Sequence, residues 1–239
     1  MPVIPSIESA HRWPKQSLPA GVWRASERPP APVTVHSSGY DELNAWLPGG
    51  GWPIGALVEV LHDAPGCGEL SLAAPALAAL SIARPIALLN PPGVPNSTAW
   101  QQWGVAPQRL WWLHPKQLTD AWWCAETVLR SRTFGALLAW VDPADPAALR
   151  RLHASAQDSQ TLVFLFRPAQ ATHTFSPSPL RLHITPTALQ QVAVQVLKAK
   201  GPKPVAPLLL DNDSQRVSLC RRFFRMPHVD GHSTLAVAR

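Results

Sequence analysis

The sequence has few cysteines and no long apolar run. Cys67, Cys124 and Cys220 are widely spaced and form no C-x-x-C pair, so neither a disulfide framework nor a zinc site is indicated. The longest apolar runs, such as 73–80, are far shorter than the roughly 20 residues that a membrane-spanning helix needs. The N-terminus lacks the cationic and apolar segments of a secretory signal. We therefore expect a cytoplasmic protein.

Common catalytic signatures are also missing. None of the nine histidines lies in an H-E-x-x-H zinc motif, and no serine lies in a G-x-S-x-G nucleophile turn. Ser71 and His62 are conceivable as a nucleophile and its base, but the sequence offers nothing to orient them. We predict no catalytic residue, no cofactor and no metal site.

Proline, tryptophan and positive charge are abundant. The chain has 27 prolines, 11 tryptophans and a hydrophobic content of 46%. So many tryptophans exceed the needs of one core, which indicates that some are exposed contact residues. The net charge of +6 favours a polyanionic partner, either DNA or an acidic protein surface.

The distribution of proline and charge divides the chain into three parts. Residues 1–37 are proline-rich and predict an extended arm, which acts either as a linker or as a docking segment through its tryptophans. Residues 38–210 carry the regular patterns of a folded domain, and residues 211–239 form a basic tail.

Strands alternate with helices through the domain. This alternation predicts an α/β fold with three layers, a mostly parallel sheet and right-handed crossovers. The pattern changes near residue 180, where two strands follow each other without a helix and predict an antiparallel edge. Strands are expected at 56–61, 85–89, 109–113, 134–141, 161–166, 180–184 and 192–197, and helices at 38–47, 70–82, 97–104, 119–132 and 144–157.

Helix ends give finer expectations. Ser38 and Thr119 precede helical patterns and are expected to cap them. Pro75 lies within the pattern of 70–82, and a proline is tolerated in a helix only in the first turn. We therefore expect Pro75 to lie in the first turn of that helix.

The most informative stretch, 43–70, reads as a glycine-rich turn, a buried strand and a glycine-containing loop that opens a helix. A loop in that place cradles phosphate when it carries G-x-x-x-x-G-K-[ST]. Gly66 and Gly68 supply glycines, but Glu69 stands where the lysine belongs and Leu70 where the hydroxyl belongs. A carboxylate repels phosphate and leucine cannot hold Mg²⁺. The sequence predicts a phosphate loop without phosphate chemistry, or a purely structural turn.

The end of the strand at 134–141 is where an acid would hold a metal ion or activate water. Asp142 lies near that place, but Trp140 occupies the inward position. Because Pro143 follows, Asp142 reads equally well as part of a turn that approaches the next helix. Arg84, the nearest cation to the glycine loop, is about a helix length away from it in the sequence.

Two groups of residues are candidate partner contacts. Trp122 and Trp123 are adjacent on a predicted helix, so both cannot face inward and one is expected at an interface. The run RRFFR interleaves aromatic rings with arginines, which suits stacking on bases or insertion into an acidic groove. A solvated tail is the equal alternative for that run, which comprises Arg221, Arg222, Phe223, Phe224 and Arg225.

The stretch LNAWLPGGGWPIGALVEVLHDAPGCGEL resembles the start of the RecA ATPase core. Together with the later motifs LAALS, LLNPP, GALLAW and FLFRP, it resembles ImuA, the RecA-like, SulA-related accessory family of bacterial SOS mutagenesis. The resemblance covers roughly residues 38–210. SulA, the SOS cell-division inhibitor, shares the later half: a W-x-x-x-G stretch, a helix ending in L-R-S, a strand ending in Trp, and FLFRP. SulA is shorter and lacks the glycine-rich lead-in, which favours ImuA.

The resemblance to ImuA implies an adaptor in translesion DNA synthesis. Its partners would be an ImuB-type, Y-family-like protein and an error-prone DnaE-type polymerase, with weak DNA contact and self-association as further options. The implied phosphate-loop positions are Gly66, Gly68 and Glu69, and Trp140 lies where RecA would place its metal-side acid. The alternative implied by SulA is an inhibitor that binds FtsZ.

Overall fold

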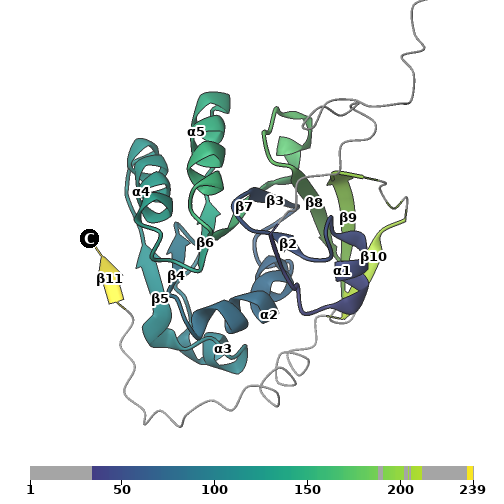
Figure 1. Cartoon of the computed structure of the whole chain (residues 1–239), viewed down its shortest axis with the longest axis horizontal. Helices are drawn as coiled ribbons and strands as arrows, with labels where there is room; N and C mark the ends of the chain where they lie inside the picture. The colour runs from purple at the N-terminus through teal and green to yellow at the C-terminus, as the bar shows by residue number, and fades with distance from the viewer. Residues whose placement is uncertain (1–33, 188–190, 202–203, 205, 212–235, 239) are drawn as a thin grey trace, which may run out of the picture. The chain divides into compact units, whose positions relative to one another are not determined.

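The computed structural model of the protein describes residues 34–187, 191–201, 204, 206–211 and 236–238 (Figure 1). The expected arm lies almost entirely outside these residues, as does the arginine-rich run of the tail.

A nine-stranded sheet forms the centre of the fold, in the order β10-β9-β8-β3-β7-β6-β4-β5-β11 (Figure 1). Neighbours from β8 to β11 run parallel, whereas β9 is antiparallel to both β8 and β10. The strands are β3 (Leu57–His62), β4 (Ile86–Leu89), β5 (Leu110–Leu113), β6 (Ala136–Trp140), β7 (Leu162–Pro168), β8 (Leu180–Pro186), β9 (Gln191–Lys198), β10 (Leu208–Asp211) and β11 (Ala236–Ala238).

Helices cover both faces of this sheet (Figure 1). One face carries α1 (Asp41–Trp46), α2 (Glu69–Ser81) and α3 (Ser97–Gln102), and the other carries α4 (Leu118–Ser131) and α5 (Pro146–Gln157). The remaining elements are the strand pair β1 (Val35–His36) and β2 (Trp52–Pro53), and the 3₁₀ helices η2 (Pro107–Arg109) and η3 (Ala169–His173).

Successive side chains along each strand point to opposite faces of the sheet, where they form two separate cores. On β3, Val58 and Val60 pack toward the α2 face, whereas Leu57 packs toward α4 and α5. The same alternation sends Phe164 of β7 to the first core and Leu165 to the second. Strands buried on both faces are mostly apolar. The strand pairing confirms the predicted α/β class, the mostly parallel sheet and its antiparallel pair. Strand β10 is absent from the strands that the sequence pattern predicts.

Pro75 corrects one expectation, because it is the seventh residue of α2 and not part of the first turn. A proline has no N–H, so the carbonyl four residues earlier, at Ser71, loses its usual helical partner. The hydroxyl of Tyr40 donates to that carbonyl at 3.0 Å. Tyr40 thus replaces the missing backbone donor, which explains how a proline is accommodated inside this helix.

The expected caps at Ser38 and Thr119 are wrong. Helix α1 begins at Asp41, and the hydroxyl of Ser38 donates to the carbonyl of Tyr40 at 3.1 Å instead of capping the helix. Helix α4 begins before Thr119, which therefore lies inside it. Side-chain caps occur elsewhere: Asn96 accepts from two backbone N–H groups of α3, and Asp145 accepts from one of α5.

We predict that the Tyr40→Phe substitution lowers the free energy of unfolding by about 1 kcal/mol, the usual worth of one buried hydrogen bond. In a Pro75→Ala background the same substitution should cost clearly less, because the backbone N–H restored at position 75 can reach the Ser71 carbonyl. Urea unfolding of the four proteins in this double-mutant cycle measures the coupling. Equal costs in both backgrounds would contradict the compensation.

Candidate functional site

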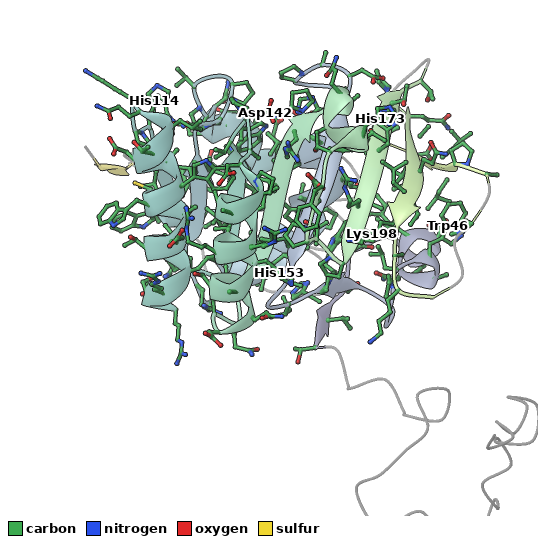
Figure 2. All side chains as sticks on the ribbon, turned by 90° about the horizontal axis from the view of Figure 1, so that it is seen from above. Trp46, His114, Asp142, His153, His173 and Lys198 are labelled. Atoms are coloured by element: carbon green, nitrogen blue, oxygen red, sulfur yellow. The ribbon has the colours of Figure 1, made fainter. Side chains whose placement is uncertain are left out.

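The candidate site lies where β3 ends and α2 begins. Strand β3 is central in the sheet, and the chain leaves it through residues 63–68 into α2 before entering β4, three positions away. In open α/β sheets the carboxyl ends of parallel strands, at the point where the strand order reverses, form the usual ligand crevice. Figure 2 shows this edge, with His114, Asp142 and His173 beyond the ends of β5, β6 and β7.

Two glycines shape the loop. Gly66 and Gly68 have φ values of 86° and 107°, a left-handed region in which a side chain costs roughly 1 kcal/mol or more. Gly68 is also the residue that precedes the first turn of α2. Such a turn at the start of a helix directs backbone N–H groups toward a common point and favours an anion there.

The chain supplies its own anion at this loop. The N–H of Gly66 donates to Oε1 of Glu69 at 2.8 Å, and the Glu69 residue is only 3% exposed. Its second oxygen, Oε2, is buried and has no hydrogen-bond partner among the described residues. The Glu69 carboxylate therefore engages a loop donor and adds a negative charge to the place where phosphate would bind.

The neighbouring positions offer no replacement for the missing phosphate ligands. Leu70 is partly buried and packs against the first core. Ser71 carries a hydroxyl one position later, but that hydroxyl donates to the Gly68 carbonyl at 2.7 Å. A hydroxyl engaged in the first helical turn is not directed at a metal ion in the loop. Neither residue performs the Mg²⁺ role expected of a working phosphate loop.

Cys67 is an unreactive thiol within the same loop. Burial raises its pKa to about 11, and the nearby carboxylates of Glu69 and Asp63 contribute in the same direction. Since the thiolate is the nucleophilic form, Cys67 is not suited to covalent catalysis at neutral pH. His183 holds the start of the loop through its Nε2, which lies 3.1 Å from Oδ1 of Asp63.

Aromatic rings occupy the end of β6 on the α2 side. Trp140 stacks on Phe166, with ring centroids 4.6 Å apart and an interplanar angle of 25°. Phe166 in turn stacks on Phe164, and Trp52 meets Phe164 edge-on. An indole does not ligate a metal ion, and Trp140 is part of the aromatic packing at the position where the resemblance to RecA implies an acid.

The carboxylate of Asp142 pairs with Arg167 and not with the loop at 63–68. Its Oδ1 accepts from Nη2 and Nε of Arg167 at 3.2 and 3.3 Å. Because this carboxylate pairs with a guanidinium group, it serves the turn after β6 and not a metal ion. No cluster of three or more His, Cys, Asp or Glu side chains that fits a metal occurs within the part of the chain that the structure describes.

Arg84, the cation nearest to the loop in the sequence, lies at the amino ends of the parallel strands, opposite the carboxyl ends where the loop lies. Its guanidinium group donates to the carbonyls of Arg132, Thr133 and Gln160 at 2.9, 3.3 and 3.0 Å. These carbonyls precede β6 and β7, so Arg84 ties the amino ends of two strands together. It does not stand in for the missing phosphate-loop lysine.

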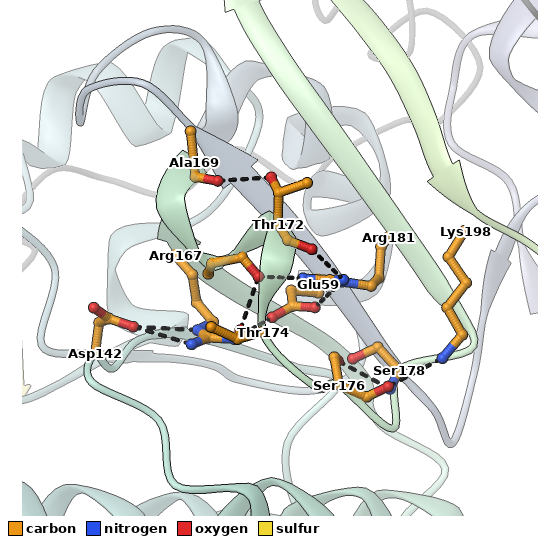
Figure 3. Close-up of polar contacts among 11 residues, drawn as sticks. Glu59, Asp142, Arg167, Ala169, Thr172, Thr174, Ser176, Ser178, Arg181 and Lys198 are labelled. Carbon is orange, nitrogen blue, oxygen red and sulfur yellow. Dashed lines mark hydrogen bonds and ion pairs between the residues drawn. The ribbon is translucent and has the colours of Figure 1, made fainter.

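A buried ionic cluster lies beside the candidate site, and the sequence analysis did not find it. Glu59 of β3 accepts from Nη1 of Arg167 at 2.7 Å and also from Nε of Arg181 (Figure 3). Arg181 further donates to the backbone carbonyls of Ala171 and Thr172 in η3, at 2.7 and 3.2 Å. The cluster therefore joins β3, β7 and β8 and fixes η3 on their surface.

The adjacent tryptophans of α4 separate as expected. Trp122 is 6% exposed and packs in the second core, whereas Trp123 is 67% exposed. The prediction that both cannot face inward is confirmed. Trp122 is consequently a core residue and not a contact surface, because α4 turns it toward the sheet. The candidate contacts Arg221, Arg222, Phe223, Phe224 and Arg225 lie outside the described residues.

Comparisons with known proteins give no family for this chain. No model of a known protein family matches the sequence, and no curated protein matches it. Among the described residues, no helix is both long and apolar enough to cross a membrane.

We predict that the Glu59→Gln substitution costs about 3–5 kcal/mol of unfolding free energy, because it leaves two buried guanidinium groups without their shared counter-charge. Asp142→Asn is the matched control. It removes one charge from the same network at a residue whose side chain is 39% exposed, and should cost less than about 1 kcal/mol. Urea unfolding compares the two. Similar losses would contradict the assignment of Glu59 as the buried centre.

Proposed function

We propose that this chain is a non-catalytic accessory protein of SOS-induced translesion DNA synthesis, built on a RecA-like core with a degenerate phosphate loop. The observation that carries the non-catalytic part is the Glu69 carboxylate bound to the Gly66 N–H. The proposal of SOS mutagenesis rests on the resemblance of residues 38–210 to ImuA, and the loop after β3 lies where such a core would hold phosphate.

Electrostatics supports a pseudo-ATPase. Phosphoryl transfer depends on positive charge that stabilises the developing negative charge, supplied mostly by a lysine and Mg²⁺. Here the loop presents a carboxylate at the lysine position, and the hydroxyl position is apolar Leu70. Nucleotide binding would require either removal of Glu69 from the loop or burial of two like charges together, and both are unfavourable.

The proposed partners are an ImuB-type, Y-family-like protein and a DnaE-type polymerase. An adaptor needs exposed anchors on a rigid scaffold, and Trp123 is such a residue because its helix is fixed to the sheet by Trp122 and Leu129. The net charge of +6 suits either an acidic partner surface or weak contact with DNA. We propose that this assembly acts in the cytoplasm.

We predict that the purified protein does not hydrolyse ATP and that Mg·ATP does not raise its melting temperature. The matched variant combines Glu69→Lys with Leu70→Ser, which introduces the two missing phosphate-loop side chains and removes the blocking carboxylate. That variant should be stabilised measurably by Mg·ATP in a thermal-shift assay. Wild-type hydrolysis at ordinary enzyme rates, about 1 s⁻¹ or faster, would contradict the proposed pseudo-ATPase.

We also predict that the ImuB-type protein from the same genome captures the wild-type chain in a pull-down. A truncation after Leu210 serves as the comparison, because it removes the arginine-rich run. Loss of capture on truncation places the contact in the tail, and retained capture places it in the folded domain. If wild type is not captured but blocks FtsZ polymerisation in a sedimentation assay, the SulA-like alternative replaces the adaptor.

A further inference from the structure

The outward faces of α4 and α5 carry an unusual combination of exposed residues. Trp123, Glu126 and Arg130 fall at i, i+3 and i+7 along α4, which places them on one face of the helix. Trp123 is strongly exposed, and the side chains of Arg130 and Arg151 are 71% and 58% exposed. Tryptophan and arginine are the residues most enriched among binding hot spots.

Glu126 holds two of these arginines in place. Its Oε2 accepts from Arg130 at 3.1 Å, and its Oε1 accepts from Nε of Arg151 on α5 at 3.2 Å. One carboxylate therefore positions two guanidinium groups from different helices. This leaves a net positive charge, and several guanidinium N–H donors have no partner among the described residues. Fixed guanidinium groups bind carboxylates at a smaller entropic cost than free ones.

A hollow continues this surface toward the carboxyl ends of the two helices. Its volume is about 310 Å³, and its lining includes Arg130, Arg132, Ser155 and Asp158. A second exposed aromatic ring lies beyond α5, where the guanidinium group of Arg150 stands 4.6 Å from the ring centroid of Phe175. We name the set Trp123, Arg130, Arg132, Arg150 and Arg151 the α4–α5 surface.

Resting on the proposed adaptor function, the geometry points to the α4–α5 surface as the docking site for a short acidic segment of the protein partner. Carboxylates of that segment pair with the four arginines, and an apolar side chain packs on Trp123. The surface does not fit a nucleic-acid backbone as well. Asp120 and Asp145 at the amino ends of the helices, and Asp158 in the hollow, interrupt the continuous positive track that consecutive phosphates require.

The test uses the full-length chain and two fluorescent probes of equal negative charge. One probe is an acidic peptide of Asp and Glu with a single Leu, and the other is a single-stranded oligothymidylate. We expect the peptide to bind wild type more tightly. The Arg151→Glu and Trp123→Ala variants should each weaken peptide binding by roughly tenfold or more, as expected for hot-spot residues.

Two control variants change exposed residues that lie outside the α4–α5 surface. Arg109→Glu makes the same charge change as Arg151→Glu at an exposed residue of η2, and Leu209→Ala truncates an exposed apolar side chain on β10. Both should bind the peptide within about twofold of wild type, because neither residue belongs to the α4–α5 surface and a distant exposed charge is largely screened by salt. Unchanged circular dichroism and melting temperature confirm that all four variants are folded.

A parallel measurement with the ImuB-type protein separates this inference from the proposed function. If that protein fails to bind wild type while the peptide binds through the α4–α5 surface, the proposed function is wrong and the surface stands. If Arg151→Glu and Trp123→Ala bind the peptide no more weakly than the controls, the surface assignment is overturned. Tighter binding of the oligothymidylate, lost in the same two variants, overturns the acidic protein segment as its occupant.

Discussion

One hydrogen bond, from the Gly66 N–H to the Glu69 carboxylate, determines how the centre of this protein is interpreted. A loop after the first central strand of an α/β sheet is a natural anion site, and here an internal carboxylate engages it. The raised pKa of Cys67 and the engaged hydroxyl of Ser71 fit a structural loop, and the second oxygen of Glu69 has no hydrogen-bond partner among the described residues. We propose that this loop is not catalytic and that the outer surfaces carry the function.

Buried and partly buried polar contacts join the strands beneath those surfaces. Glu59 joins Arg167 and Arg181 beneath η3, while Arg84 binds the carbonyls that precede two strands at the opposite edge. Both groups link neighbouring strands through polar contacts. Helices α4 and α5 pack on the same sheet through the second core.

The sequence predicts the class of the fold because its signals are local. Short apolar runs locate the central strands and period-3.6 patterns locate the helices, and the adjacent tryptophans of α4 separate as helical geometry requires. Contacts between distant residues leave no such signal. The bond from Tyr40 to the carbonyl of Ser71, which accommodates Pro75, spans 31 positions, and Glu59 meets its arginines across 108 and 122 positions. The sequence shows that position 69 holds a glutamate instead of a lysine. It does not show that the carboxylate accepts a hydrogen bond from the loop.

The most direct test of the central claim is a ¹H–¹⁵N spectrum of the protein recorded while Mg·ATP is added. The Gly66 amide reports the bond to Glu69, and the Gly68 amide reports the start of α2. If the internal carboxylate occupies the loop, both resonances stay in place at millimolar nucleotide. Saturable shifts of these two amides, with the remainder of the spectrum unchanged, would show that phosphate displaces Glu69 and would contradict the account.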